Sequence, residues 1–164
     1  MSVGIEYIRK LCKLMLTLNQ GDHLNTLGMT FTEIEKGFVT MELPYSEGIV
    51  GNPQTGIVHG GAVTALLDTC CGIAAGTMLE EVGMCPTLDL RMDYMRAAAP
   101  NDTIYAQARV YRTTNSVIFC RGKAYQKDPE RPVAYCVANF ARLDPEVLRA
   151  MSEQLKPFLD TVES

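Results

Sequence analysis

The spacing of apolar residues changes along the chain, and each change predicts a new element. An apolar face with helical spacing, interrupted by charged residues on the other side, predicts a helix over about residues 3–18. Alternating apolar and polar positions then predict two strands, around 27–31 and 39–43, joined by a turn. Residues 46–58 contain three glycines and Pro53, which predicts a long loop of the kind that often has a function.

The second half of the chain begins with an apolar run that predicts one long helix from Gly60 to about Leu79. Alternation then returns, and Leu88 and Leu90 fall on the apolar face of the next strand with Thr87 on its polar face. A short helix over about 145–155 follows the last strand. The four predicted strands of this half lie around 88–94, 104–110, 118–124 and 134–140.

This order of elements, with runs of strands on either side of one long helix, favours an antiparallel α+β sheet. The long helix is apolar nearly all round, which indicates burial on nearly all sides. Small residues on the inner strand faces would let a helix lie close to the sheet: Ala106, Ala108, Cys120, Gly122, Ala124, Ala134, Cys136 and Ala138. We therefore expect a curved sheet wrapped around this helix, with a second subunit completing the cover.

Three polar residues interrupt the long helix: Thr64, Asp68 and Thr69. Thr64 and Asp68 are four residues apart and share one edge of the helix. A buried aspartate costs free energy unless it is hydrogen-bonded or neutralised. Two interpretations follow. Asp68 either has a structural role, accepting hydrogen bonds from Thr64 or a neighbouring backbone group, or faces a water-containing cleft as a base or nucleophile.

The long helix starts at His59-Gly60-Gly61. Paired glycines let the backbone approach a ligand, and free N–H groups at a helix N-terminus suit a developing oxyanion. Alternatively, the glycines only shape the turn into the helix. Asp68 follows His59 by nine residues, which is ~13 Å along an ideal helix and about 180° around it. His59 and Asp68 can therefore serve one reacting carbon only if they come from different subunits.

Composition narrows the classes of function. The chain has 164 residues, enough for one domain with a core, and we expect a single domain over residues 1–164. A net charge of −4 disfavours a general nucleic-acid surface. The six cysteines include no CxxC pair, and we interpret them as buried and reduced. No stretch reaches the ~20 apolar residues of a membrane span, so we expect a cytoplasmic protein.

Two stretches carry a resemblance to a known family. GNPQTGIVHGGAVTALLDTCCGIAAG at 51–76 and PTLDLRMDYMRAA at 86–98 resemble the hotdog-fold acyl-CoA thioesterases of the PaaI/acyl-CoA thioesterase 13 type. The resemblance covers about residues 24–143. It implies a six-stranded antiparallel sheet wrapped around a long central helix, here with an N-terminal helix and a short C-terminal helix. It also implies hydrolysis of acyl-CoA thioesters to free acid and CoA.

Carried over residue by residue, the resemblance implies a catalytic site of five residues. Asp68 matches the carboxylate that acts as general base or nucleophile, and Gly60 matches the backbone donor that polarises the thioester carbonyl. Asn52 and His59 match the polar pair around the carbonyl and the water. Thr87 matches the hydroxyl residue that helps hold the water near the carboxylate. The family builds each site from two subunits, in agreement with the helix geometry.

CoA carries phosphates, so the resemblance also implies a basic binding surface. The CoA-contacting segments of the family correspond to 94–99 and 112–117, where Arg96 and Arg112, the latter in a predicted turn, suit phosphate pairing. Arg121 and Lys123 are interpreted as solvated charges on the outer sheet face. No metal or cofactor is expected, since CoA is part of the substrate. The expected substrate-binding residues are Gly61, Thr69, Tyr94, Arg96, Arg112, Asn115 and Ser116.

Two other functions stay open. A non-catalytic acyl-CoA-binding protein, acting as sensor or carrier, would keep the pocket without needing Asp68. A hotdog dehydratase would need a differently placed histidine, whereas the chain has only His59 and His23, which is interpreted as a surface loop residue. The fold implies a homodimer with a continuous sheet. Aromatic residues on the outer face favour a homotetramer in which a second dimer covers them: Tyr105, Tyr111, Phe119 and Tyr125.

Overall fold

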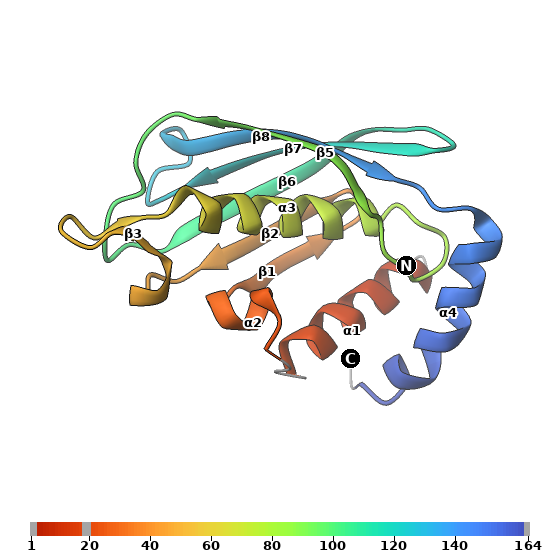
Figure 1. Cartoon of the computed structure of the whole chain (residues 1–164). Helices are drawn as coiled ribbons and strands as arrows, with labels where there is room; N and C mark the ends of the chain where they lie inside the picture. Colours follow the sequence, from red (N-terminus) through yellow and green to blue (C-terminus); the bar gives the residue numbers. More distant parts are fainter. Residues whose placement is uncertain (1–2, 18–20, 163–164) are drawn as a thin grey trace.

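A computed structural model describes residues 3–17 and 21–162 and shows one curved sheet with a helix in its hollow (Figure 1). The sheet has six strands in the order β1-β2-β6-β7-β8-β5, and all neighbours are antiparallel. The predicted α+β hotdog architecture is therefore confirmed. The elements are α1 (Val3–Thr17), α2 (His23–Leu27), β1 (Thr30–Glu35), β2 (Phe38–Leu43), β3 (Val50–Asn52), β4 (Ile57–Val58), α3 (Gly60–Gly76), β5 (Thr87–Tyr94), β6 (Ile104–Thr113), β7 (Val117–Tyr125), β8 (Pro132–Ala141) and α4 (Pro145–Leu159).

Helix α3 is the predicted long helix, and small residues allow its close approach to the sheet. Its side chains at Leu66, Leu67 and Cys71 are fully buried against β6, β7 and β8. Gly122 on β7 has no side chain to separate the layers. A Cβ atom there would lie 2.9 Å from Cys136 Sγ and 3.0 Å from Leu67 Cδ2. Glycine at this position therefore lets the sheet lie close to α3 without displacing these side chains.

Several element limits differ from the sequence prediction. Leu27, predicted to begin a strand, and the exposed His23, predicted to lie in a loop, both belong to α2. This helix forms because Asp22 caps it by accepting from Asn25 N–H at 2.9 Å. The loop over 46–58 contains the short β3–β4 hairpin. Helix α3 ends at Gly76 rather than near Leu79. The predicted end of the first helix at residue 18 lies outside the described residues.

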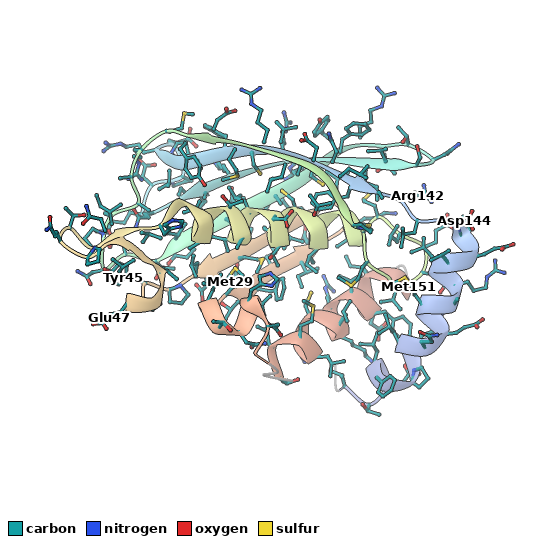
Figure 2. The ribbon with its side chains drawn as sticks, viewed as in Figure 1. Met29, Tyr45, Glu47, Arg142, Asp144 and Met151 are labelled. Atoms are coloured by element: carbon teal, nitrogen blue, oxygen red, sulfur yellow. The ribbon has the colours of Figure 1, made fainter. Side chains whose placement is uncertain are left out.

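The C-terminal helix is longer than predicted and reaches Leu159. Asp144 begins it by accepting a hydrogen bond from Glu146 N–H at 2.8 Å (Figure 2). Ser152 and Lys156 both donate to Glu81 at 2.7 Å, which anchors the later turns of α4 beyond residue 155. In the part of the chain that the structure describes, no helix is long and apolar enough to cross a bilayer.

Strand β5 is an edge of the sheet, and several of its apolar side chains are open to solvent. Leu88 is 60% exposed, and Tyr94 is 50% exposed. An edge strand offers unpaired backbone groups to a further strand. The described chain thus leaves one long sheet edge, with apolar side chains on it, beside the helix that carries Asp68.

Candidate functional site

Asp68 and Thr87 meet at the start of β5. The Thr87 hydroxyl donates to Asp68 Oδ1 at 3.0 Å. A β-bulge makes this contact possible, because Thr87 pairs with Phe140 and Asp89 with its neighbour Asn139, which leaves Leu88 as an extra residue. Simple alternation put Thr87 and Leu90 on opposite faces. The bulge instead turns Thr87 toward α3, to the same face as Leu90.

Thr64 does not supply the hydrogen bond to Asp68 that the structural interpretation proposed. Its hydroxyl donates to Gly60 O at 3.1 Å and lies 2.6 Å from the Tyr94 hydroxyl. The half-buried Asp68 carboxylate is held by Thr87 instead. Thr69 donates to Ala65 O at 2.8 Å, so its hydroxyl also bonds within the helix. The interpretation in which Thr64 donates to Asp68 is therefore wrong.

The start of α3 presents one free backbone donor. His59 is the N-cap, and its Nδ1 accepts from Gly61 N–H at 2.9 Å. The Gly60 N–H makes no hydrogen bond with any residue in the described ranges. Tyr94 donates its hydroxyl to Gly60 O at 2.8 Å. Of the two predicted glycine donors, Gly60 is thus the one left open for a ligand.

Both glycines also leave room for neighbouring side chains. A Cβ atom at Gly60 would lie 3.1 Å from the Tyr94 hydroxyl oxygen, and one at Gly61 would lie 2.9 Å from His59 Nδ1. The turn interpretation and the ligand interpretation of these glycines are therefore compatible. The sequence did not predict the contact between the Thr64 and Tyr94 hydroxyls. The only signal in the sequence is that Thr64 follows Gly60 by one helical turn, which places its side chain near the start of α3.

Asn52 lies at the end of β3, beside the segment that leads into α3. Its side-chain Oδ1 accepts from Gln54 N–H at 3.0 Å, so the side chain is used in the turn between β3 and β4. Tyr45 donates its hydroxyl to Gly56 O in the same turn at 3.0 Å (Figure 2). His59 N–H donates to Ile49 O at 2.8 Å, which holds the hairpin against the helix start.

A cavity of about 330 Å³ opens beside the Gly60 end of α3. Most of its lining is apolar, as in small-molecule sites. Arg96 is one of its lining residues, and its Nε and Nη2 donate to Arg131 O at 3.2 and 2.8 Å. The lining residues are Val58, Gly60, Val63, Tyr94, Met95, Arg96, Ala97, Ala98 and Val133.

The remaining predicted binding residues lie at the opposite end of β5. Ser116 O accepts from Arg142 N–H at 2.8 Å, and Ala141 N–H donates to Pro86 O at 2.8 Å, next to Thr87. Arg112 lies in β6 rather than in the predicted turn, because β6 extends to Thr113 past a bulge. Asn115 is exposed in the turn that follows.

Within one chain, the candidate residues therefore form two groups, one toward each end of β5, and His59 and Asp68 are ~13 Å apart along α3. The first group contains Asp68, Thr69, Thr87, Arg112, Asn115 and Ser116. The second contains Asn52, His59, Gly60, Gly61, Tyr94 and Arg96. The expectation that His59 and Asp68 do not meet within one chain agrees with this arrangement.

The cysteines lie mostly in the core, as the sequence indicated, and all six are free. Burial raises the pKa of the Cys12 thiol to about 12 and that of Cys85 to about 11. A hydrogen bond from Cys71 lowers the pKa of Cys136, but Cys136 is almost inaccessible to solvent. Among the described residues, no group of three or more His, Cys, Asp or Glu side chains is arranged to hold a metal ion.

Comparison with known proteins defines the class. Residues 55–133 match the family model described as the thioesterase superfamily. A crystal structure of a Pseudomonas aeruginosa protein is 45% identical, covers 84% of this chain and 97% of its own, and has a TM-score of 0.70. The chain belongs to the thioesterase superfamily, and thioester hydrolysis is the chemistry for which this family is named.

Two further proteins are similar to this chain. The PaaI protein from the phenylacetic acid degradation operon of E. coli has a TM-score of 0.68 at 17% identity, with coverage of 84% of this chain and 96% of its own. It shares the hotdog fold. A protein named as an esterase in Halobacterium salinarum is 32% identical over 58% of this chain. The alignment spans 66% of the length of that curated relative.

Proposed function

We propose that this protein hydrolyses acyl-CoA thioesters to the free acid and CoA, with Asp68 as the catalytic carboxylate. The contact that carries the proposal is the hydrogen bond from Thr87 to Asp68. It holds a carboxylate at a fixed position on a helix that is otherwise almost entirely apolar. Such a carboxylate suits thioester hydrolysis, in which it can act as a general base for water or as a nucleophile.

In this mechanism, the Gly60 N–H stabilises the oxyanion that develops on the thioester carbonyl. Asp68 either removes a proton from a water that bonds to the carbonyl carbon, or attacks that carbon itself. Collapse of the tetrahedral intermediate breaks the C–S bond, and the CoA sulfur leaves as a thiol, taking its proton from protonated Asp68 in the first route and from solvent in the second. In the second route, water then hydrolyses the acyl–Asp68 anhydride and restores the carboxylate. His59 and Asn52 orient the carbonyl and the water from the Gly60 side. Thr87 holds the carboxylate in the orientation that either route requires.

A homodimer formed through β5 would supply the missing half of each site. If two β5 strands pair in antiparallel fashion about a two-fold axis, the Thr87 end of one strand faces the Tyr94 end of the other. Asp68 of one protomer then lies near Gly60 of the partner subunit. The exposed edge strand and its apolar side chains support this pairing.

The same pairing would assemble the CoA-binding surface. It brings Arg112, Asn115 and Ser116 of one protomer toward Arg96 of the partner subunit. The Arg112 side chain is exposed and makes no hydrogen bond or ion pair with another residue in the described ranges, so its guanidinium is available for a phosphate. We assign the phosphates of CoA to this surface.

We further propose a tetramer that forms through the outer sheet face, in the cytoplasm. Tyr105 stacks on Tyr125 with ring centroids 5.7 Å apart, and Tyr111 lies 6.2 Å from Phe119. These two pairs lie six residues apart along β7, with Arg121 and Lys123 between them, and in this proposal a second dimer covers them. The six free cysteines support a reducing compartment.

The test is a hydrolysis panel over short, medium, long and aryl acyl-CoAs, read by thiol release, with wild type and Asp68→Asn. Asparagine keeps the shape of the side chain and an acceptor for Thr87 but cannot act as base or nucleophile. We expect kcat to fall by about 10²–10⁴. The dissociation constant of a non-hydrolysable acyl-CoA thioether should change little.

Each other outcome has a clear meaning. Binding of the thioether without turnover by wild type on any substrate would favour the sensor or carrier. Equal turnover by wild type and Asp68→Asn would show that Asp68 is not the catalytic carboxylate.

A further inference from the structure

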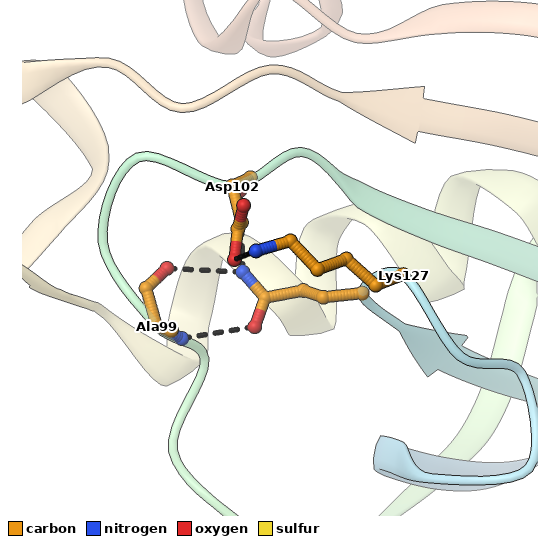
Figure 3. Close-up of polar contacts among 4 residues, drawn as sticks. Ala99, Asp102 and Lys127 are labelled. Carbon is orange, nitrogen blue, oxygen red and sulfur yellow. Dashed lines mark hydrogen bonds and ion pairs between the residues drawn. The ribbon is translucent and has the colours of Figure 1, made fainter.

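Gln126 is a buried polar residue that the proposed chemistry does not use. It follows directly after β7 and is only 3% exposed. Its Oε1 accepts from Ala99 N–H at 2.9 Å, and its Nε2 donates to Ala99 O at 2.9 Å (Figure 3). Nε2 also donates to Asp102 O at 3.2 Å. The amide thus pairs with both backbone groups of Ala99, as a neighbouring strand would.

The segment held in this way forms one wall of the cavity. Residues 95–99, the wall segment, follow β5 without regular structure, and the first four of them line the cavity. Met95 N–H donates to Val133 O at 2.8 Å, which fixes one end of the segment to β8. The Gln126 amide fixes the other end. The wall of the cavity therefore depends on one side chain from a different part of the chain.

The wall segment is also connected to the start of α3. Val58 N–H donates to Ala98 O at 3.2 Å, and Val58 immediately precedes His59. A continuous chain of contacts therefore runs from Gln126 through Ala99 and Ala98 to Val58 and the helix N-terminus. A shift of Ala99 would move the cavity wall and the strand that leads to Gly60 together.

We propose that Gln126 is a positioning residue that sets the wall segment and thereby the affinity for the acyl thioester. This extends the acyl-CoA hydrolysis proposed above, since the cavity beside Gly60 is where the thioester would bind. Gln126 lies behind the wall and does not touch the reacting atoms. Its loss should therefore weaken substrate binding more than it slows the chemical step.

The test compares Gln126→Leu, which removes all three hydrogen bonds at similar size, with Gln126→Glu, which keeps only the acceptor for Ala99 N–H. Lys127→Ala is the matched control, because it removes the adjacent ion pair of Lys127 Nζ with Asp102 at 2.9 Å and leaves the wall contacts in place (Figure 3). Thermal unfolding and circular dichroism first establish that each variant is folded.

For Gln126→Leu we expect KM and the dissociation constant of an acyl-CoA thioether to rise by about tenfold, with kcat within about twofold of wild type. The KM and the thioether dissociation constant of Gln126→Glu should lie between those of Gln126→Leu and wild type. Amide hydrogen exchange in the wall segment should be faster in Gln126→Leu and unchanged in Lys127→Ala.

The proposal is overturned if Gln126→Leu retains wild-type exchange in the wall segment, or if exchange rises while KM and the thioether affinity stay within twofold of wild type. It is also overturned if Lys127→Ala has the same effects as Gln126→Leu. Failure of wild type to bind or hydrolyse any acyl-CoA would instead contradict the proposed function. The exchange measurement separates the two cases, because it needs no substrate.

Discussion

The peptide unit that joins Gly60 to Gly61 is held on both of its polar groups. Its carbonyl accepts from Tyr94 and Thr64, and its N–H donates to His59 Nδ1. The preceding N–H, that of Gly60, makes no hydrogen bond within the described residues. A fixed and unpaired donor stabilises an oxyanion without having to reorganise during the reaction. At this scale, the site is a single N–H held in place by three side chains.

Replacing Gly60 can remove this N–H while sparing the helix. Proline suits the first position of a helix, and His59 already has φ −66° and ψ 132°, the conformation that a residue before proline adopts. Gly60→Ala is the matched control, because it places the same Cβ beside Tyr94 but keeps the N–H. Relative to Gly60→Ala, we expect Gly60→Pro to lower kcat by about 10²–10³ in the thiol-release assay. Equal kcat values would exclude Gly60 as the donor.

At the scale of elements, β5 joins the two ends of the site. It pairs with β8 along its inner side, and its outer edge is free in the described chain. The bulge at Leu88 turns Thr87 toward Asp68, and Tyr94 at the other end reaches Gly60. One strand therefore positions a hydroxyl group for each half of the site.

Much of this arrangement could be predicted from the sequence, because β2, β6, β7 and β8 alternate buried and more exposed residues through most of their length. Strand β1 does not, since a bulge between Phe31 and Glu33 interrupts its pattern. The bulge at Leu88 could not be predicted, since Leu88 is apolar and continues the alternation of Leu90 and Met92; only pairing with β8 reveals the extra residue. Helix α2 was missed because five residues are too few for a periodic signal.

Some residues of the candidate site could likewise be predicted from the sequence, and others could not. The residues of the HGG triplet and Asp68 are readable from helix spacing, because α3 is regular. Gln126 is not, because a glutamine after a strand has no local signal for a partner twenty-seven residues away. Contacts that depend on how separate elements pack become visible only in the folded chain.

Pairing through β5 can be tested with a charge on its exposed edge. Leu88→Glu places a carboxylate where the partner would cover an apolar side chain, and we expect the dissociation constant of the dimer to rise by about tenfold or more. Val147→Glu is the control, because Val147 is another exposed apolar residue but lies on α4. Light scattering over a dilution series measures the dimer dissociation constant of each variant. Identical behaviour of the two variants would contradict an interface at β5.

At the scale of the whole molecule, one folded chain contains all the residues of the proposed site but does not bring them together. Asp68 and Thr87 lie at one end of β5, while His59, Gly60 and Tyr94 lie at the other. A two-fold axis across β5 would convert these two incomplete groups into two complete sites. The central claim is therefore that each site takes its carboxylate from one subunit and its oxyanion donor from the other.

Complementation tests this claim most directly. Asp68→Asn and Gly60→Pro subunits, each inactive as a homodimer, are co-expressed with different affinity tags, and the heterodimer is purified through both tags. If the sites are shared, one site of the heterodimer carries both substitutions and the other carries neither, so thiol release should recover to about half of the wild-type rate. If each site is built from one chain, every site carries a substitution. A heterodimer no more active than the two parent homodimers would contradict the shared site.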